Sequence, residues 1–448
     1  MTPDVLTAVP ASATAPAAAA PARTPLPARR AAPVSADPRL AVIGLGYVGL
    51  PTGLAATAAG LPVIGIDTSR VRLRRIRAGT VDLLERDHER LREALDAGSL
   101  RMTDNARALR LADVVLICVP TPVHEDHSPD LRALREACAT AVAHARAGQT
   151  LILTSTSYVG TTADLLTGPL AARGLTVGED IHVAFSPERI DPGNVTTMQE
   201  ETPRVVGGAT VACTERAAAF LERLTTRVHR VTSMEAAELT KLYENTFRAV
   251  NIAFAYEMAD AAAHYGLDPI EVTEAAATKP YGFMAFYPGP GVGGHCIPCD
   301  PHYLLDPLQT AGRAAPIVRQ AMGAIADRPR RVVRRATELL GEPRGKRVLM
   351  VGVAYKPGVQ DVRESPSLDI LAALEDAGCT VAYHDPLIPT LTLGARALHS
   401  EPAPRGRDWD LAVVGTVHAG SDYTFLDDCP LLLDGTYRVG AGDRRHTL

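Results

Sequence analysis

Residues 39–49 of the chain read RLAVIGLGYVG, an apolar run that passes directly into three glycines spaced as Gly-x-Gly-x-x-Gly. The apolar run predicts a buried strand, and the small residues from Leu50 to Ala59 predict the helix that follows it. A second apolar strand, Leu61–Ile66, ends at Asp67. A strand, a glycine turn, a helix and an acidic residue in this order are typical of a dinucleotide-binding site.

The glycines of this turn have separate expected roles. Gly44 allows the tight turn, Gly46 lets the backbone approach a pyrophosphate, and Gly49 lets the helix pack on the strand. The start of the helix, with Tyr47 and Val48, is expected to receive the phosphates.

Asp67 is expected to accept hydrogen bonds from the ribose hydroxyls of the nucleotide. A carboxylate at this position would repel a 2′-phosphate, so the sequence favours NAD over NADP. A turn with a purely structural role is the alternative, and the matching strand, helix and acid speak against it.

The composition excludes several classes of protein. The chain has 448 residues, of which 46% are hydrophobic and 22% charged, and this length predicts two to three domains. A net charge of −5 without a basic stripe argues against a nucleic-acid partner. Seven cysteines without a signal-peptide pattern indicate free thiols in a reducing compartment, and we expect the cytoplasm. No apolar run approaches the ~20 residues that cross a bilayer, so no membrane partner is expected.

Predicted strands and helices alternate along most of the chain, which is typical of doubly wound parallel sheets. The expected helices are 80–97, 131–147, 233–265 and 315–340, and the expected strands are 112–119, 150–154, 181–185, 346–353, 381–384, 411–414 and 431–433. The fold class is therefore α/β, with two Rossmann-like domains joined by a long central helix. The expected parts are a disordered Ala/Pro-rich tail (1–37), a nucleotide-binding domain (38–230), a central helical domain (231–325) and a second Rossmann-like domain (326–448).

Several polar or turn-forming residues follow the predicted strands, where the ligand crevice of a doubly wound sheet lies. They are Pro120, Thr121, Thr156, Glu188 and Arg189. For each of them a plain turn or cap is the alternative to a role in the site, and for Glu188 the alternative is an ion pair with Arg189.

The predicted helix at 233–265 carries Lys241, Asn245 and Arg248 at i, i+4 and i+7, hence on one face. A solvated polar stripe is the usual explanation of such spacing, but both flanks are apolar or small, so we expect the face to look into a cleft. A partly desolvated lysine can stabilise developing negative charge there. A helix of this length would reach ~50 Å, enough to bridge two domains or pair with a second subunit.

Residues 289–300 read GPGVGGHCIPCD and place Cys296 behind a run of glycines that can bend around a substrate. A thiolate can attack a carbonyl and hold an acyl group, so Cys296 is a candidate nucleophile, with Asp300 on the same segment. A small buried hydrophobe is the alternative for any free cysteine. Cys296 and Cys299 also form a Cys-x-x-Cys pair beside His295, but half a zinc site is disfavoured because no second ligand pair is evident. A disulfide that silences Cys296 under oxidation is a further hypothesis.

The second Rossmann-like domain lacks the full glycine triplet, so a looser mode of nucleotide binding is expected there. Its best polar candidates are Lys356, Asp361 and Arg363, which follow its first predicted strand. The aromatic Tyr287, beside the glycine run, could belong to a loop that covers the substrate.

Seven motifs follow one another between about Arg39 and Val439. They are GLGYVGLP, VPTP, the Ser155-Thr156 pair, SPER, ELTKLYENTFRAVN, GPGVGGHCIPCDPHYL and AYKPGVQDVRESP. Together they make the chain resemble the UDP-glucose/GDP-mannose dehydrogenase family, the nucleotide-sugar 6-dehydrogenases. The resemblance implies a four-electron oxidation of a sugar C6 alcohol to a carboxylate with two NAD⁺. It also implies a homodimer or higher homo-oligomer formed through the long helix.

Carried onto this sequence, the resemblance implies that Cys296 attacks the C6 aldehyde to give a thiohemiacetal, which a second oxidation converts to a thioester for hydrolysis. Lys241 and Asn245 would stabilise the oxyanion and the bound water. Asp300 and Glu188 would orient or deprotonate water.

The resemblance also assigns residues to the cofactor and to a UDP-sugar held by the C-terminal domain. Thr156 would position a water or the cofactor, Arg363 would reach the cofactor of a neighbouring subunit, and Lys356 would meet the nucleotide part of the substrate. The expected substrate-binding residues are Glu188, Arg189, Lys241, Asn245, Arg248, Tyr287, Gly293 and Lys356. The expected cofactor-binding residues are Gly44, Gly46, Tyr47, Val48, Gly49, Asp67, Pro120, Thr121, Thr156 and Arg363, and no metal ligand is expected.

Details of the motifs bear on the sugar. The UDP-glucose branch carries lysine before the aspartate of the cysteine segment, where this chain has Cys299. The stretches HCIP at 295–298, PHYL at 301–304 and YENTFR at 243–248 look more like the branch that oxidises UDP-N-acetylhexosamines. The resemblance therefore favours UDP-N-acetylglucosamine or UDP-N-acetylmannosamine over UDP-glucose. Thr154 departs from that branch, which more often has an acid there.

Two other classes of protein compete with this interpretation. A two-electron 3-hydroxyacid dehydrogenase shares the nucleotide domain and a Lys-x-x-x-Asn helix, but it has no need of Cys296. A non-catalytic NAD-binding protein would not require Cys296, Lys241, Asn245 and Asp300 together.

Overall fold

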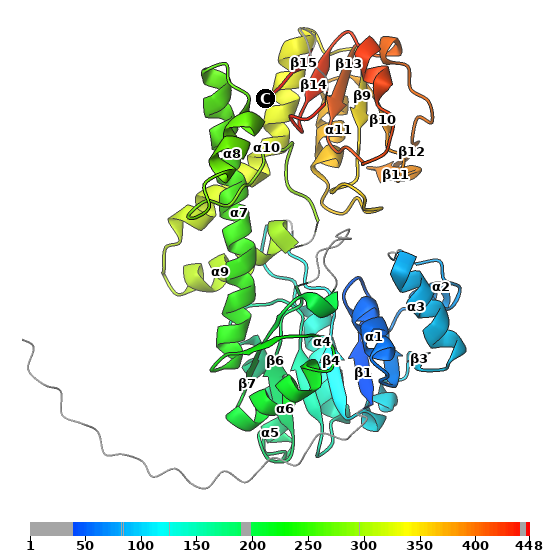
Figure 1. Ribbon diagram of the computed structural model, residues 1–448, viewed down its shortest axis with the longest axis vertical. Coiled ribbons are helices and arrows are strands. Elements are labelled where there is room, and N and C mark those ends of the chain that lie inside the picture. Colours follow the sequence, from blue (N-terminus) through cyan, green and yellow to red (C-terminus); the bar gives the residue numbers. More distant parts are fainter. Residues whose placement is uncertain are drawn as a thin grey trace, which may run out of the picture. The chain divides into compact units, whose positions relative to one another are not determined.

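Figure 1 shows the computed structural model of the chain, which describes residues 39–81, 83, 85–124, 126–189, 199–294, 296–439 and 445–448. The expected tail at 1–37 lies outside the described residues, and so does His295. Strands and helices alternate in two sheets, which confirms the α/β fold class. Among the described helices, none is both long and apolar enough to span a bilayer.

The first sheet has the strand order β3-β2-β1-β4-β5-β6-β7-β8. Its strands are β1 (Leu40–Ile43), β2 (Val63–Ile66), β3 (Leu100–Thr103), β4 (Val114–Ile117), β5 (Thr150–Leu153), β6 (His182–Phe185), β7 (Arg204–Gly208) and β8 (Val228–Arg230). Its helices are α1 (Gly49–Ala58), α2 (Arg70–Arg77), α3 (Glu85–Asp96), α4 (Arg132–His144), α5 (Gly168–Ala172) and α6 (Val211–Leu221), with the short turns η1 (Ala106–Leu111), η2 (Ala163–Thr167) and η3 (Gln199–Glu201).

The expectation of a fully parallel sheet is wrong at one pair of strands. β6 and β7 run antiparallel, whereas the other paired strands of this sheet are parallel. A parallel return needs a long crossover, usually a helix. The described residues between β6 and β7 contain only the short turn η3, so the chain turns back instead.

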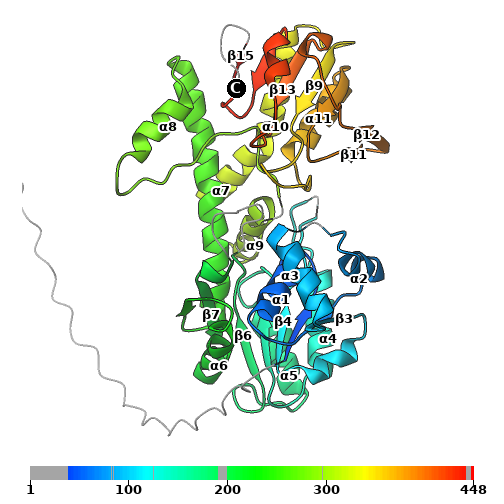
Figure 2. The same ribbon diagram turned by 45° about the vertical axis from the view of Figure 1, so that its right-hand side comes forward.

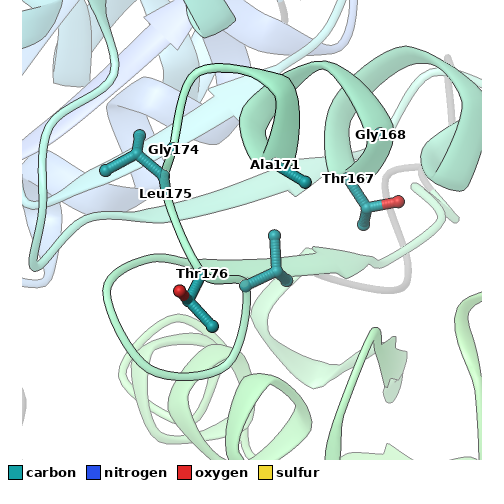
Figure 3. Close-up of a pocket in the computed structure, with 7 residues that line it drawn as sticks. Thr167, Gly168, Ala171, Gly174, Leu175 and Thr176 are labelled. Carbon is teal, nitrogen blue, oxygen red and sulfur yellow. The ribbon is translucent and has the colours of Figure 1, made fainter.

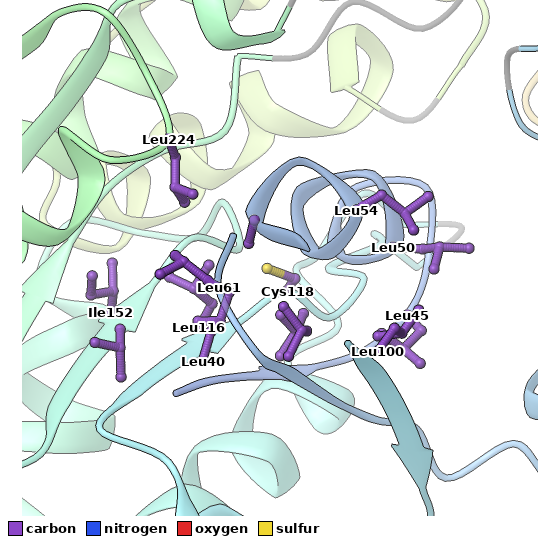
Figure 4. Packing of buried hydrophobic residues seen from close by; sticks show 14 of the residues in the cluster. Leu40, Leu45, Leu50, Leu54, Leu61, Leu100, Leu116, Cys118, Ile152 and Leu224 are labelled. Atoms are coloured by element: carbon purple, nitrogen blue, oxygen red, sulfur yellow. The ribbon is translucent and has the colours of Figure 1, made fainter. Parts of the chain in front are cut away.

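Side chains alternate along a strand, so β1 divides its residues between two cores. Leu40 and Val42 pack with residues of α1, α3 and α6, whereas Ala41 and Ile43 pack with residues of α4 and α5. Figure 4 shows the first of these cores, where leucines of α1 lie above the strands. Helices therefore cover both faces of the sheet, as doubly wound folds require.

β1 also fixes where a ligand can bind. It lies between β2 and β4, with Leu40 paired to Val63 on one side and to Val114 on the other. The chain winds outward in both directions from this point, and such sheets bind ligands at the carboxyl ends of the strands there.

The long helix α7 (Met234–His264) agrees with the prediction for 233–265 to within one residue at each end. Ser233 caps it, because its hydroxyl oxygen accepts a hydrogen bond from the Ala236 N–H. The helices that follow are α8 (Pro269–Ala277), α9 (Cys296–Thr310) and α10 (Pro316–Leu340). α9 and α10 both pack against α7 (Figure 2). The segment from Cys296 onward, for which no helix was predicted, is therefore helical from Cys296 itself.

The second sheet has the strand order β10-β9-β13-β14-β15 and is parallel throughout its described strands. The strands are β9 (Arg347–Val351), β10 (Thr380–His384), β13 (Leu411–Val414), β14 (Leu432–Asp434) and β15 (Arg445–His446). β11 (Thr390–Leu393) and β12 (Arg396–His399) form a separate antiparallel pair, and η4 (Gly406–Asp408) and η5 (Thr424–Asp428) are short turns. α10 and α11 (Pro366–Asp376) share a core with this sheet, and Pro366 occupies the first turn of α11.

Gly49 is the position of the first glycine turn that should tolerate a side chain least. A Cβ there would lie 1.9 Å from the Gly44 carbonyl oxygen, whereas a Cβ at Gly46 would meet nothing within 4 Å. Gly49→Ala should therefore destabilise the protein by about 1–3 kcal/mol, the usual effect of overpacking. Gly46→Ala, the matched control, should unfold at the wild-type denaturant concentration. Equal midpoints for the two variants in chemical denaturation would contradict this account.

Candidate active site

The turn after β1 offers exposed backbone to a phosphate group. Gly44 has a φ of +87°, which favours glycine, and a Cβ there would lie 2.4 Å from the Cys118 carbonyl oxygen. Gly46 faces open space, so a pyrophosphate can approach its backbone closely. Asp67 accepts hydrogen bonds from Leu45 N–H at 2.9 Å and from Ser69 N–H at 2.8 Å, which hold its carboxylate beside the turn. These residues fit NAD, with Asp67 placed for the ribose.

Arg363 lies over this turn, although it belongs to the C-terminal part of the chain. Its guanidinium carbon is 4.2 Å from the centre of the Tyr47 ring. It also forms a two-point ion pair with Asp361, with Nε and a terminal nitrogen 2.9 and 2.7 Å from one carboxylate oxygen. The sequence predicted that Arg363 reaches the cofactor of a neighbouring subunit. In this structure Arg363 contacts the nucleotide turn of its own chain.

Cys296 is an exposed residue at the first position of α9, where helix N–H groups point outward without partners in the helix. Although the side chain reaches solvent, the protein packed around the thiol and the nearby charge of Asp300 raise the pKa of Cys296, while Lys241, Arg363 and Arg248 lower it. These five side chains therefore lie close enough to interact, as the sequence predicted for all of them but Arg363.

Asp300 lies four residues after Cys296, on the same face of α9. It is 3% exposed, and it accepts a hydrogen bond from the side-chain amide of Asn245 on α7. Burial raises the pKa of Asp300 to about 6, against the opposing effects of the Lys241 charge and the Asn245 hydrogen bond. A thiol, a proton acceptor, an ammonium and an amide donor are thus grouped in one place.

The glycine run before Cys296 packs against the segment after β9. A Cβ at Gly293 would lie 2.6 Å from the Glu364 carbonyl oxygen, and one at Gly294 would lie 2.8 Å from the Tyr355 ring. Gly294 N–H also donates to the Arg363 carbonyl at 3.1 Å. The glycines therefore serve close packing between two distant segments, which sequence reasoning did not anticipate when it assigned Gly293 to the substrate.

Glu188 and Arg189 do not pair through their side chains. Glu188 forms a buried ion pair with Arg204 at 2.6 Å, and it accepts from the backbone N–H of Arg189 at 2.8 Å. Arg189 instead pairs with Glu244 of α7. Sequence reasoning missed Arg204 because it starts β7, a strand that was not predicted.

The remaining predicted residues lie around this group. Thr121 is buried just beyond β4, and Thr156 is half-buried just beyond β5, at the carboxyl edge of the first sheet. Pro120 shares the β4 edge, where the hydroxyl of Tyr303 on α9 donates to the Pro122 carbonyl at 3.2 Å. Tyr287 contacts Arg438, whose guanidinium lies 4.9 Å from the ring centre.

Arg328 on α10 is a buried cation that sequence reasoning also missed. It is 0% exposed and stacks on the ring of Tyr256 of α7 at 4.5 Å. Its nitrogens donate to the Gly289 carbonyl at 2.9 Å and to the Tyr437 hydroxyl at 2.8 Å. One side chain thus joins α7, the start of the glycine run and the C-terminal sheet region.

Within the described residues, no group of three or more His, Cys, Asp or Glu side chains is arranged to hold a metal ion. Cys299, the second cysteine of the pair, is buried, and burial raises the pKa of its thiol to about 12.

A separate hollow of about 540 Å³ lies beside α5 and the loop that follows it (Figure 3). Its lining is small, apolar or hydroxylic: Thr167, Gly168, Ala171, Gly174, Leu175, Thr176 and Val177. It offers no charged group to a ligand, so the candidate site is the group around Cys296.

Comparison with known proteins identifies the family of the chain. The chain matches the family models of the NAD-binding domain (38–225), the central domain (235–324) and the UDP-binding domain (349–435) of the UDP-glucose/GDP-mannose dehydrogenase family. It is 34% identical to a UDP-N-acetyl-D-mannosamine dehydrogenase of Pyrococcus horikoshii, with 78% of this chain and 84% of the relative covered. It is 33% identical to an NDP-N-acetyl-D-galactosaminuronic acid dehydrogenase of Ralstonia solanacearum, with 81% and 87% covered.

Solved structures give the same result. The structure of the UDP-D-ManNAc dehydrogenase from Pyrococcus horikoshii has a TM-score of 0.83 at 30% identity, covering 91% of this chain and 98% of that one. A UDP-glucose dehydrogenase from Pyrobaculum islandicum has a TM-score of 0.78 at 28% identity, covering 90% and 94%. The chain therefore belongs to the UDP-glucose/GDP-mannose dehydrogenase family and is an NAD-dependent nucleotide-sugar dehydrogenase.

Proposed function

We propose that the protein oxidises the C6 hydroxyl of a UDP-N-acetylhexosamine to the carboxylate, with Cys296 as the covalent nucleophile. The observation that carries this proposal is the grouping of Cys296 with Asp300, Lys241 and Asn245 at the junction of α7 and α9. When bound, NAD⁺ supplies the hydride acceptor for each of the two oxidations. The domain roles follow the expected division, with residues 38–230 for the cofactor, 231–325 for the chemistry and the dimer contact, and 326–448 for the UDP-sugar.

The side chains divide the chemistry among them. The Cys296 sulfur adds to the C6 aldehyde carbon. Asp300, one turn further along α9, accepts the proton that the thiol releases. Lys241 and Asn245 supply the positive charge and the N–H donor for the oxygen that becomes negative. After the second oxidation has produced a thioester, water attacks its carbonyl carbon, the C–S bond breaks and the Cys296 thiol is restored.

Glu188, Arg189 and Thr156 are proposed to act around this centre rather than on sulfur. The ion pair with Arg204 holds the Glu188 carboxylate in place, which suits the orientation of a water molecule. Arg248, exposed on α7, and Lys356, after β9, are proposed to meet the substrate.

The choice of sugar rests on the relatives and on one residue. The relatives named above include enzymes for UDP-N-acetyl-D-mannosamine and for an NDP-N-acetyl-D-galactosaminuronic acid. Cys299 stands where the UDP-glucose branch has lysine, and it is buried one turn from the nucleophile.

All seven cysteines are free thiols, which supports a reducing compartment such as the cytoplasm.

The proposal predicts two NADH for each sugar oxidised. A panel of UDP-N-acetylmannosamine, UDP-N-acetylglucosamine, UDP-glucose and GDP-mannose, followed at the nicotinamide absorbance, should show turnover with a UDP-N-acetylhexosamine. Cys296→Ala should bind NAD⁺ but form no acid. Cys299→Ala, the matched control, should keep the stoichiometry of two. One NADH per sugar in the wild type, or acid formed by Cys296→Ala, would refute the thioester route.

The proposal also predicts an acidic limb in the pH profile. Asp300 must be ionised to accept a proton, and its pKa is raised to about 6. The rate constant kcat should therefore rise as the pH increases through about 6. Asp300→Asn should lower kcat by about 10²–10⁴-fold and remove this limb, because the amide cannot accept the proton. Asp306 is an exposed aspartate on the same helix, so Asp306→Asn should leave kcat and the acidic limb unchanged. An acidic limb in Asp300→Asn identical to that of the wild type would assign the limb to another group.

We further propose a homodimer that forms through α7. Large apolar side chains on this helix are exposed, although its opposite face packs on α9 and α10. They are Leu239 (45%), Tyr243 (70%), Phe247 (42%), Phe254 (56%) and Met258 (44%). Their spacing of four or seven residues places them on one stripe, as expected for a surface that a second copy covers.

The double variant Tyr243→Glu/Phe254→Glu should be monomeric, because each carboxylate would be buried without a partner in the dimer. Light scattering should show half of the wild-type mass. Leu111→Glu, on an exposed apolar residue of the first sheet's turns, is the control and should keep the wild-type mass. A wild-type protein that is already monomeric at micromolar concentration would contradict the proposed homodimer.

A further inference from the structure

The two sheets begin with the same backbone arrangement. Gly44 after β1 donates its N–H to the Ile66 carbonyl at 2.8 Å, and Gly352 after β9 donates to the His384 carbonyl at 2.8 Å. Their φ angles are +87° and +80°. A Cβ on either glycine would collide with a backbone carbonyl oxygen, 2.4 Å and 1.9 Å away. Gly352 is therefore the counterpart of the first glycine in the NAD-binding turn.

The acidic residue of the NAD-binding turn also has a counterpart. Asp67 follows β2 and accepts from the N–H of Leu45, the residue after the glycine. Asp385 follows β10 and accepts from the N–H groups of Val353 at 2.8 Å and Ala354 at 3.0 Å, directly after Gly352. In the first sheet this carboxylate is placed for a ribose.

In the second sheet the carboxylate is occupied from within the protein. His418 Nε2 lies 3.2 Å from one Asp385 oxygen, and the Leu387 N–H donates to the same oxygen at 2.9 Å. Asp385 is 1% exposed and His418 is 3% exposed. Burial alone would raise the pKa of Asp385, but the hydrogen bonds from His418 and the backbone lower it to about 2. The carboxylate is thus charged, and because it is buried and bound by these partners it is not open to a ribose.

His418 extends this hold to the far end of the loop after β9. Its Nδ1 accepts a hydrogen bond from the Gly358 N–H at 3.0 Å, so Nε2 must carry the proton that is donated to Asp385. The Asp385–His418 pair therefore accepts hydrogen bonds from the backbone of residues 353 and 354 at the start of the loop and of residue 358 at its end. Lys356 lies between these anchors.

We propose that His418, oriented by Asp385, is a positioning residue for the nucleotide part of the substrate. By fixing the Gly358 N–H, it holds the loop 353–358 in the shape that presents Lys356 to the UDP group. The inference rests on the proposed function of Lys356. It explains why the second sheet keeps the first glycine and the acid of a dinucleotide turn but uses the acid as an internal anchor.

Two isosteric variants separate the two hydrogen bonds of His418. His418→Asn places an amide oxygen near the position of Nδ1 and can still accept from Gly358. His418→Gln places an amide nitrogen near Nε2 and can still donate to Asp385, but it leaves Gly358 without an acceptor. Affinity for UDP alone is measured by calorimetry on the intact protein, together with affinity for NAD⁺ and the thermal midpoint.

We expect His418→Gln to weaken UDP binding about tenfold, the usual effect of one lost hydrogen bond with an unsatisfied donor, and to raise KM for the nucleotide sugar more than it lowers kcat. His418→Asn should bind UDP within about threefold of the wild type. Affinity for NAD⁺ should be unchanged in both. Wild-type UDP affinity in His418→Gln, or equal losses of UDP and NAD⁺ affinity in both variants, would overturn the inference.

Lys356→Ala distinguishes this inference from the proposed function on which it rests. It should weaken UDP binding without changing the thermal midpoint. If Lys356→Ala binds UDP as the wild type does, the proposed role of Lys356 is wrong, and the comparison of His418→Gln with His418→Asn still decides whether the loop backbone positions the nucleotide.

Discussion

The hydrogen bond from Gly294 N–H to the Arg363 carbonyl is the contact on which the arrangement of the site depends. It fixes the residues just before α9 against the segment that follows β9, and no side chain fits between them at Gly293 or Gly294. Cys296 is thereby held within the field of Arg363 as well as of Lys241. The protein packed around Cys296 disfavours its thiolate form, whereas the positive charges of Arg363 and Lys241 favour it.

The same region shows how one turn serves two purposes. After β1, Gly46 leaves the backbone open, and the acid, Asp67, is only half-buried. After β9, the equivalent glycine remains because the turn itself needs it, while the positions of Gly46 and Gly49 are taken by Ala354 and Pro357. The turn after β1 needs Gly44 and Gly49 for backbone packing and Gly46 for an open approach, whereas the turn after β9 keeps only the first glycine.

Local pattern was sufficient for the parts of the fold that local energetics control. Local pattern predicted the strand, glycine turn and helix around Gly44, and it predicted the full length of α7. In both cases the apolar periodicity and the residues that begin or end the element lie close together in the sequence, as Ser233 does at the start of α7. α9 was missed because its sequence holds Pro301 and Pro307, which argue against a helix. The partner of Glu188 was missed because Arg204 reaches it across a strand pair that no short window contains. In the site, residue types were predictable, but the packing that joins Arg363 to Tyr47 was not.

Arg328 has a consequence for how the molecule responds to heat. Its guanidinium has its acceptors on the glycine run, on Tyr437 and on Asp260 of α7, and its flat face lies on Tyr256. Pulling any one of these parts away would leave a fully buried guanidinium with fewer acceptors, at a cost of about 1–3 kcal/mol or more. Fraying of the C-terminal layer is therefore coupled to loss of α7 packing, and the two should melt as one cooperative unit instead of in separate steps.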